Sequence, residues 1–460
     1  MTPSVHPFRR GRSLTSLLAL LALIAASCSQ RDDDDASTSG GEDGGESAGG
    51  SSIDTESCIT DPNTEIEGDT IRLVSSYPQS GVTAAFSEIA RGWQAYFDMV
   101  NADGGVDIGG QSYQIEWETR DDQYDAARTS TNIDELVGSE GDGAFAVFSV
   151  VGTANNLAVR TNLGDLCVPN LFAATGAPAW GNPDLPWTIG STLSAYSLEA
   201  EVFAQLLEEE NPEAQVAMLV QDDDFGRAYE ETFLSVTEDT DIEVVQTERY
   251  APGIDTDVSA QVTSLAASGA DVFFNGATLL ACPDALTSAA SANWERSITW
   301  VSSTCLSKTL MGLAGEAGDG VYSIANIKDP QSPEWADDEA MQLYRDTVAQ
   351  YQPEADIDNS IVAYGWTQGA VLVEALEAAE APTRLAVMES VRNLDLGDDV
   401  GLMLPGTGVL TDSDDGDVFL GDRLNLVQYN FAETHFQPVG DVYDFEGETE
   451  SITPEDLIIE

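Results

Sequence analysis

Basic residues are scarce in this chain of 460 residues. Lysine and arginine together number 18 against 81 aspartates and glutamates, and the only two lysines are Lys308 and Lys328. Nucleic-acid binding needs clusters of basic side chains, and no such cluster follows the first arginines of the chain. The same shortage argues against electrostatic binding to anionic lipid head groups. The net charge of -63 predicts a solvated acidic surface, which fits ordinary solubility or adaptation to saline water, where salt screens the repulsion.

Histidine is also scarce, and the motifs of common enzymes are missing. His435 is the only histidine after His6, so a zinc site is not expected. The run from Asp412 to Asp417 suggests calcium, but its glycine comes one position too early, and a hairpin turn is the better interpretation. No Gly-x-Ser-x-Gly elbow between a strand and a helix, phosphate-binding loop or dinucleotide fingerprint occurs. We therefore expect a protein that is not an enzyme and that uses no metal and no cofactor.

Long apolar runs are missing apart from one near the start of the chain. Arginines at positions 9, 10 and 12 precede an apolar run from Leu14 to Ala26 that is too short for a comfortable membrane span. Residues 1–27 thus have the pattern of a bacterial export signal, and the small residues before Cys28 resemble the lipobox of bacterial lipoproteins. The alternatives are cleavage beside an incidental cysteine and twin-arginine export. We expect Cys28 to carry a lipid that anchors the protein to the outer face of the cytoplasmic membrane, at the cell surface or in the periplasm.

The next segment is rich in serine, glycine and acidic residues. It includes four successive aspartates, Asp32 to Asp35, and almost no large apolar side chains before residue 57. Such a composition cannot bury enough surface to fold, so residues 28–65 are predicted to form a disordered acidic tether. The lipid is then the only expected contact with the membrane.

Four cysteines besides Cys28 remain: Cys58, Cys167, Cys282 and Cys305. An even number of cysteines in an exported chain suggests two disulfides. Cys282 and Cys305 follow consecutive predicted strands, so we expect these two to pair with each other. Cys58 is then expected to pair with Cys167.

From residue 70 onward, short apolar strands alternate with amphipathic helices. The alternation restarts after Trp187 and gives two similar runs, 70–190 and 191–320. This pattern predicts an α/β fold with two lobes, each a mostly parallel sheet flanked by helices. Two helices follow, and Val409–Asp412 and Leu424–Phe431 are expected to be paired strands.

The chain does not start a third lobe after residue 320, so we expect the two lobes to exchange segments. The first lobe is predicted to comprise residues 66–190 and 322–402. The second is predicted to comprise residues 191–321 and 403–445, and residues 446–460 are predicted to form an acidic tail.

Several short motifs occur in an order that matches one family. They are Ser80-Gly81, Asn101 to Gly105, Asp121-Asp122-Gln123, Asp224-Phe225-Gly226, Tyr250 to Gly253, Gly318 to Tyr322, and Asp414 to Asp417. In this order they resemble the branched-chain-amino-acid-type (Leu/Ile/Val-binding-like) substrate-binding proteins of ABC transporters, which have the type I periplasmic-binding fold. The resemblance covers most of residues 68–440. It implies a Venus-flytrap mechanism, in which a solute is trapped between hinged lobes and delivered to a permease.

The resemblance also implies which loops bind the solute. The expected contacts are loop residues that follow strands: Ser80, Gly81, Phe86, Gly152, Thr153, Ala154, Ala174, Thr175, Gly176, Phe225, Thr278 and Thr304. In the family, the turns at 152–154 and 174–176 bind a ligand carboxylate, which fits the unsatisfied N–H groups of helix N-termini. Helix capping is the alternative role for each serine and threonine.

One position departs from the family. Amino-acid binders often place an acidic residue near Thr304 to hold the ammonium group, and a threonine lacks that charge. Asp222 or Asp223 is the alternative source, although a solvated turn is their ordinary role. The expected ligand is therefore left open among amino acids, amides and small carboxylates. The expected function is delivery of this small polar solute to an ABC permease by a monomeric protein, and the alternative is a sensor for a membrane signalling partner.

Overall fold

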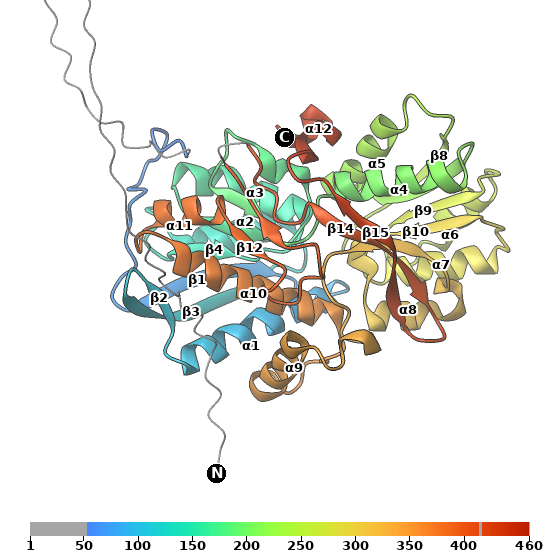
Figure 1. The fold of residues 1–460 in the computed structure, drawn as a ribbon. Helices are drawn as coiled ribbons and strands as arrows, with labels where there is room; N and C mark the ends of the chain where they lie inside the picture. The colour runs from blue at the N-terminus through green and yellow to red at the C-terminus, as the bar shows by residue number, and fades with distance from the viewer. Residues whose placement is uncertain (1–52, 414–415, 460) are drawn as a thin grey trace, which may run out of the picture. The chain divides into compact units, whose positions relative to one another are not determined.

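The computed structural model describes residues 53–413 and 416–459. The predicted export signal, the predicted lipidation site at Cys28 and the first part of the predicted tether lie outside the described residues. The described residues form two mostly parallel sheets flanked by helices, together with a two-stranded ribbon (Figure 1). This is the α/β class that the alternation of strands and helices predicts.

We call the first sheet and the helices around it the first lobe. Within the described residues the strand order is β2-β3-β1-β4-β5-β6, and only β2 is antiparallel to its neighbour. The strands are β1 (Thr70–Tyr77), β2 (Val106–Ile108), β3 (Gln111–Asp121), β4 (Ala146–Phe148), β5 (Asn170–Ala173) and β6 (Thr188–Gly190). The helices are η1 (Ala84–Ser87), α1 (Glu88–Ala102), α2 (Ala126–Val137), α3 (Thr153–Asp165), η2 (Pro178–Gly181), η5 (Pro333–Trp335), α9 (Glu339–Tyr351), α10 (Ser360–Ala378) and α11 (Arg384–Val391). Central strands covered on both faces need apolar side chains on both faces, which explains the continuous apolar runs.

We call the second sheet and its helices the second lobe. Within the described residues its strand order is β15-β14-β11-β10-β9-β7-β8. The strands are β7 (Gln215–Gln221), β8 (Glu243–Tyr250), β9 (Val272–Gly276), β10 (Ile298–Val301), β11 (Tyr322–Ala325), β14 (Arg423–Asn430) and β15 (His435–Asp444). The helices are α4 (Tyr196–Glu210), α5 (Asp224–Val236), α6 (Ser259–Ala266), α7 (Ala281–Ser291), η3 (Ser303–Cys305), α8 (Lys308–Ala314) and η4 (Gly315–Gly318). Strands β14 and β15 are antiparallel and extend the sheet beyond β11.

The late strands pair differently from the sequence expectation. Strand β13 (Val409–Leu410) pairs with β12 (Asp395–Gly397), whereas β14 pairs with β11 and β15, so the predicted pairing of 409–412 with 424–431 is wrong. Most of β14 is buried, and it needs a strand on each side to satisfy its backbone. Because β11 also belongs to the second sheet, the chain returns to the first lobe after residue 325 rather than at 321.

The segments at both ends of the described chain are folded. Residues 53–65, assigned above to the disordered tether, lie against the first lobe, where Ile53 is buried and Ile59 N–H donates to the Asp165 carbonyl at 2.8 Å. At the other end, the expected acidic tail forms α12 (Thr449–Ile452) and α13 (Glu455–Ile458). Leu457 in α13 is 1% exposed, which explains why this segment folds despite its acidic composition.

Helices α1 and α10 lie side by side in the first lobe although they are far apart in the sequence (Figure 1). Glycines at the crossing permit the close approach. A Cβ atom added at Gly365 would lie 1.9 Å from the Ile89 carbonyl oxygen, and one added at Gly92 would lie 2.1 Å from the Val362 carbonyl oxygen. This crossing holds α10, which follows the return of the chain from the second lobe, against the first lobe.

Candidate functional site

A cavity of about 150 Å³ lies between the two lobes. Loop residues that follow β4, β5, β9 and β10 line it, so the carboxyl ends of strands in both sheets contribute to the wall. This is the position where doubly wound sheets bind ligands. Eight of the twelve residues proposed from sequence line the cavity: Phe86, Gly152, Thr153, Ala174, Thr175, Phe225, Thr278 and Thr304.

The first-lobe wall has a polar corner at the start of α3. The Thr153 and Thr175 hydroxyl oxygens are 2.6 Å apart, and both side chains are buried. Gly152, at the N-cap of α3, has a φ of 104°, and a Cβ there would lie 2.8 Å from the Tyr124 ring. Only glycine suits this position, because the backbone is left-handed and an aromatic ring covers it.

The second-lobe wall combines aromatic rings with hydroxyl groups. Phe225 is 2% exposed, and its ring centroid lies 4.8 Å from that of Tyr196 in an edge-to-face contact. Thr278 donates a 2.8 Å hydrogen bond to Gln221, and the Thr304 hydroxyl lies 2.9 Å from that of Ser302. These hydrogen bonds fix both threonine side chains at the wall.

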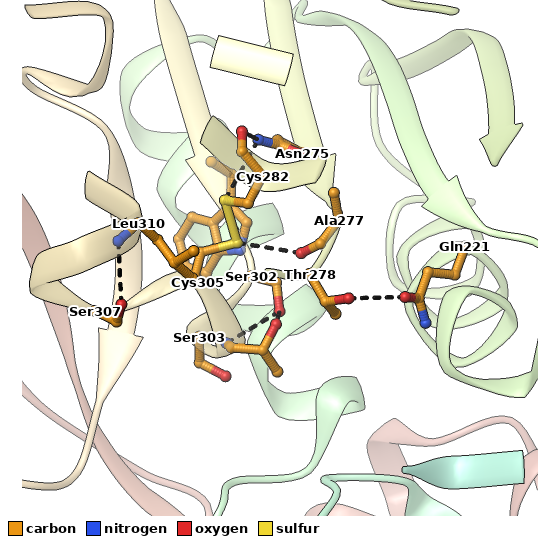
Figure 2. The surroundings of a disulfide bond; sticks show 12 residues. Gln221, Asn275, Ala277, Thr278, Cys282, Ser302, Ser303, Cys305, Ser307 and Leu310 are labelled. Atoms are coloured by element: carbon orange, nitrogen blue, oxygen red, sulfur yellow. Dashed lines mark hydrogen bonds between the residues drawn. A yellow bond between two sulfur atoms is a disulfide. The ribbon is translucent and has the colours of Figure 1, made fainter. Parts of the chain in front are cut away.

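A disulfide joins the two loops that carry these threonines. Figure 2 shows the bond between Cys282, at the start of α7, and Cys305, at the end of η3, with Thr278 and Ser303 close by. The other disulfide joins Cys58 to Cys167, with Cα atoms 5.5 Å apart. Of the two disulfides, only Cys282–Cys305 lies next to the cavity.

Four proposed contacts do not line the cavity. Ser80 donates to Asp121 at 2.5 Å, Gly81 is exposed, and Ala154 is one residue too far along α3. Gly176 is buried, and its carbonyl accepts the Tyr196 N–H at 2.7 Å. These residues shape the turns around the wall.

The sequence reasoning missed several lining residues, some of them aromatic. Tyr124 directly follows the turn Asp121-Asp122-Gln123. Tyr196 begins α4, directly after the segment in which the chain crosses from the first lobe to the second. Asp122 is fully buried and accepts hydrogen bonds from Ser76, Thr129 and the Tyr124 N–H, which fixes the turn that places Tyr124 at the cavity. The motif Asp121-Asp122-Gln123 could therefore have predicted that the next residue, Tyr124, lies at the cavity. The other missed contacts come from loops, strands and helices of both lobes: Ile89, Val151, Leu193, Ser194, Ser303, Leu306, Ile324 to Asp329, Trp335, Ser360, Ile361, Tyr364, Leu404, Val427, Phe436 and Pro438.

An acid is buried directly behind the second-lobe wall. Glu199 in α4 accepts hydrogen bonds from the Tyr229 hydroxyl at 2.7 Å and from the backbone N–H of Ser303 at 2.8 Å. Burial raises the pKa of Glu199 from 4.5 to about 7, although these donors act in the opposite direction. Because Ser303 lines the cavity, Glu199 supports the wall without contacting the space inside.

The lobes touch beside the cavity. Leu279 and Leu310 of the second lobe belong to the same hydrophobic cluster as Phe86 of the first. Lys308 of α8 also pairs with Asp358, just before α10, at 3.2 Å. The structure therefore shows the two lobes brought together around the cavity.

Comparisons with known proteins agree with this architecture. A family model described as periplasmic binding protein matches residues 70–429. No curated protein sequence matches the chain. In the part of the chain that the structure describes, no helix has both the length and the apolar character needed to cross a bilayer.

Solved structures provide the other comparison. The chain is similar to a branched chain amino acid ABC transporter protein from Thermus thermophilus with bound valine, at 17% identity and TM-score 0.72, covering 84% of this chain and 99% of that one. It is similar to a fatty acid ABC transporter substrate-binding protein from Thermomonospora curvata, at 18% identity and TM-score 0.71, covering 86% and 97%. It is also similar to a substrate-binding periplasmic protein from Ralstonia solanacearum, at 21% identity and TM-score 0.67, covering 79% and 98%. At these identities the likeness establishes the fold.

The family match spans most of the chain and contains the whole first sheet and the second sheet apart from β15 and the last residue of β14. Proteins of this family act outside the cytoplasm and bind solutes without transforming them, so this chain is a solute-binding protein and not an enzyme. The chain belongs to the periplasmic binding protein family and has the type I fold of the branched-chain amino acid ABC transporter substrate-binding proteins.

Proposed function

We propose that the protein is an exported, lipid-anchored solute-binding protein that captures a small polar solute and delivers it to the permease of an ABC importer. The observation that carries the proposal is the cavity between the lobes, with walls made of strand-end loops from both sheets. Opening of the lobes would admit a solute, and closing would seal it from water. The closed form would then be the one that docks on the permease.

The arrangement of the wall supports a solute with one polar end. The Thr153 and Thr175 hydroxyls and the N-terminus of α3 offer hydrogen-bond donors for a carboxylate or amide oxygen. Phe86, Tyr196 and Phe225 provide the apolar surface for the remainder. Amino acids, amides and small carboxylates all fit this description.

The anchor is the second part of the proposal. Cys28 would carry the lipid, and the residues between it and residue 53 would form the tether of a monomeric protein. A C28S variant is expected to appear in the soluble exported fraction instead of the membrane fraction. An unchanged distribution between the two fractions would exclude the lipid anchor.

The binding step is tested with the purified mature protein in a thermal-shift screen of amino acids, amides and small carboxylates. A ligand at 100 times its dissociation constant stabilises the folded state by about 2.7 kcal/mol. F225A and T153V should lose the shift, whereas L234S, which changes an exposed side chain on the same helix as Phe225, should keep it.

The delivery step is tested by uptake into proteoliposomes that contain an ABC permease from the same organism. Uptake that depends on the loaded protein supports import. Binding without uptake, together with altered activity of a membrane kinase or cyclase, would instead support the sensor.

A further inference from the structure

The wall of the cavity is largely apolar. Phe86, Tyr124, Tyr196, Phe225 and Tyr364 contribute aromatic rings from both lobes. Aliphatic side chains fill much of the space between them: Ile89, Val151, Leu193, Leu306, Ile324, Ile327, Ile361, Leu404 and Val427. An apolar cavity of about 150 Å³ holds a body the size of benzene. The wall thus fits a compact hydrophobic group rather than a fully polar solute.

Formal charges are nearly absent from this wall. Among the described residues that line the cavity, only Lys328 and Asp329 carry charged groups. The Lys328 ammonium lies 2.9 Å from Asp338 and 5.3 Å from the centre of the Trp335 ring. Asp329 accepts the backbone N–H groups of Gln331 and Phe436. Lys328 therefore has an ionic partner, and each oxygen of Asp329 accepts one backbone N–H group.

The two aspartates that the sequence offers as a replacement for an acid at position 304 do not line the cavity. Asp222 is exposed. Asp223 caps α5 by accepting the Gly226 N–H at 3.3 Å, and both of its oxygens lie 3.3 Å from the Gln221 amide nitrogen. Asp329 is therefore the only carboxylate on the described wall, and an ammonium group in the cavity would have to share it with two backbone N–H groups.

The polar corner, in contrast, retains capacity for hydrogen bonds. Ser194 lines the cavity and is 1% exposed, and its hydroxyl has no hydrogen-bond partner among the described residues. The Ser194 backbone carbonyl lies against Gly176, the residue after Thr175. A solute oxygen placed at this corner would accept the Ser194 hydroxyl, which the described residues leave unpaired.

We infer that the solute is a compact monocarboxylic acid with an aromatic or similarly sized apolar body and no cationic amine. This inference rests on the proposed solute-binding function and narrows its ligand class. The carboxylate lies at the corner formed by Thr153, Thr175 and Ser194, and the body lies between Phe86 and Phe225. α-Amino acids are disfavoured because the described wall offers their ammonium group no carboxylate apart from Asp329, whose oxygens already accept two backbone N–H groups.

The test is isothermal titration of the purified mature protein with benzoate and phenylacetate, compared with L-phenylalanine, L-leucine and benzamide. We expect at least one aryl carboxylate to bind more than about 100-fold more tightly than either amino acid. Benzamide has the same ring without the charge and separates carboxylate recognition from ring recognition. F225A should weaken aryl-carboxylate binding, whereas L234S should not.

Position 304 provides a charge-matched pair of variants. T304D adds a carboxylate to the wall, and T304N adds a side chain of the same shape without the charge. We expect T304D to weaken the binding of aryl carboxylates and strengthen that of L-phenylalanine relative to T304N. Equal effects of the two variants on both ligands would count against the inference.

The outcomes separate the inference from the proposed function. If L-leucine or L-phenylalanine binds best, and D223N or D329N abolishes that binding, the protein is still a solute-binding protein but the ligand class is wrong. If benzamide binds as tightly as benzoate, the carboxylate assignment is wrong. If no compound binds to folded, ligand-free protein, both the inference and the proposed binding chemistry fail.

Discussion

At the scale of single residues, Glu199 couples the wall of the cavity to pH. Burial raises the pKa of this carboxyl group from 4.5 to about 7, so the folded protein binds the Glu199 proton more tightly than the unfolded chain does. The resulting stabilisation is fully present below about pH 4.5 and is lost as the pH rises through about 7. The difference corresponds to about 3 kcal/mol in the free energy of unfolding.

Replacing Glu199 by glutamine should remove this dependence. We expect the melting temperature of the wild type to fall more steeply between pH 5 and pH 8 than that of E199Q, measured by differential scanning calorimetry. E208Q, which changes an exposed glutamate on the same helix, should follow the wild type. Parallel pH profiles for wild type and E199Q would contradict the assignment.

At the scale of elements, the two disulfides restrain different parts of the protein. Cys58–Cys167 closes a separation of 109 residues and Cys282–Cys305 one of 23, so the loop-entropy model assigns them about 5 and about 3 kcal/mol. Only Cys282–Cys305 joins the loops of Thr278 and Thr304. We expect C282A/C305A to lower both the urea midpoint and the ligand affinity, and C58A/C167A to lower the midpoint alone. A C58A/C167A variant with weakened ligand binding would show that this division of roles is wrong.

The crossing of α1 and α10 depends on the absence of a side chain at Gly365. G365A would press a methyl group into the Ile89 backbone and should cost about 3 kcal/mol of unfolding free energy. Gly312 in α8 has open space around its Cβ position, so G312A should leave stability unchanged or raise it by up to about 1 kcal/mol. The measurement is the urea midpoint of each variant, and equal midpoints would refute the packing argument.

At the scale of the whole molecule, the final segment contacts both lobes. Helix α12 lies against α4 of the second lobe and α13 against η2 of the first. Asp456 pairs with Arg227, and the Thr453 hydroxyl donates to Ser197. This segment therefore adds to the contacts that hold the two lobes in the observed arrangement.

Removal of residues 449–460 should destabilise the protein by about 3 kcal/mol or more, because Leu457 and Ile458 lose their burial. The urea midpoint should fall, and L457S alone should reproduce much of the loss. I459S changes a side chain that is 60% exposed and is the matched control. A truncated protein with the wild-type midpoint would show that the segment only rests on the surface.

Sequence reasoning reached the fold because the alternation of strands and helices repeats at every step of both lobes. It found the loops after β4, β5, β9 and β10, since strand ends can be read from the chain. It missed Tyr196, Lys328 and Tyr364, because crossover segments and returning helices reach the cavity through tertiary packing that no local pattern encodes. It also misplaced the strand at 322–325, whose partner lies about a hundred residues further along the chain.

The bond between Cys58 and Cys167 decides which half of the molecule any upstream attachment would hold. Because residues 53–65 are bonded to the first lobe, a chain anchored by its N-terminal end would be attached through that lobe. The second lobe would then be the part that swings when the solute enters or leaves. A pair of optical probes, one on each lobe, would therefore report each capture event as a change in the distance between them.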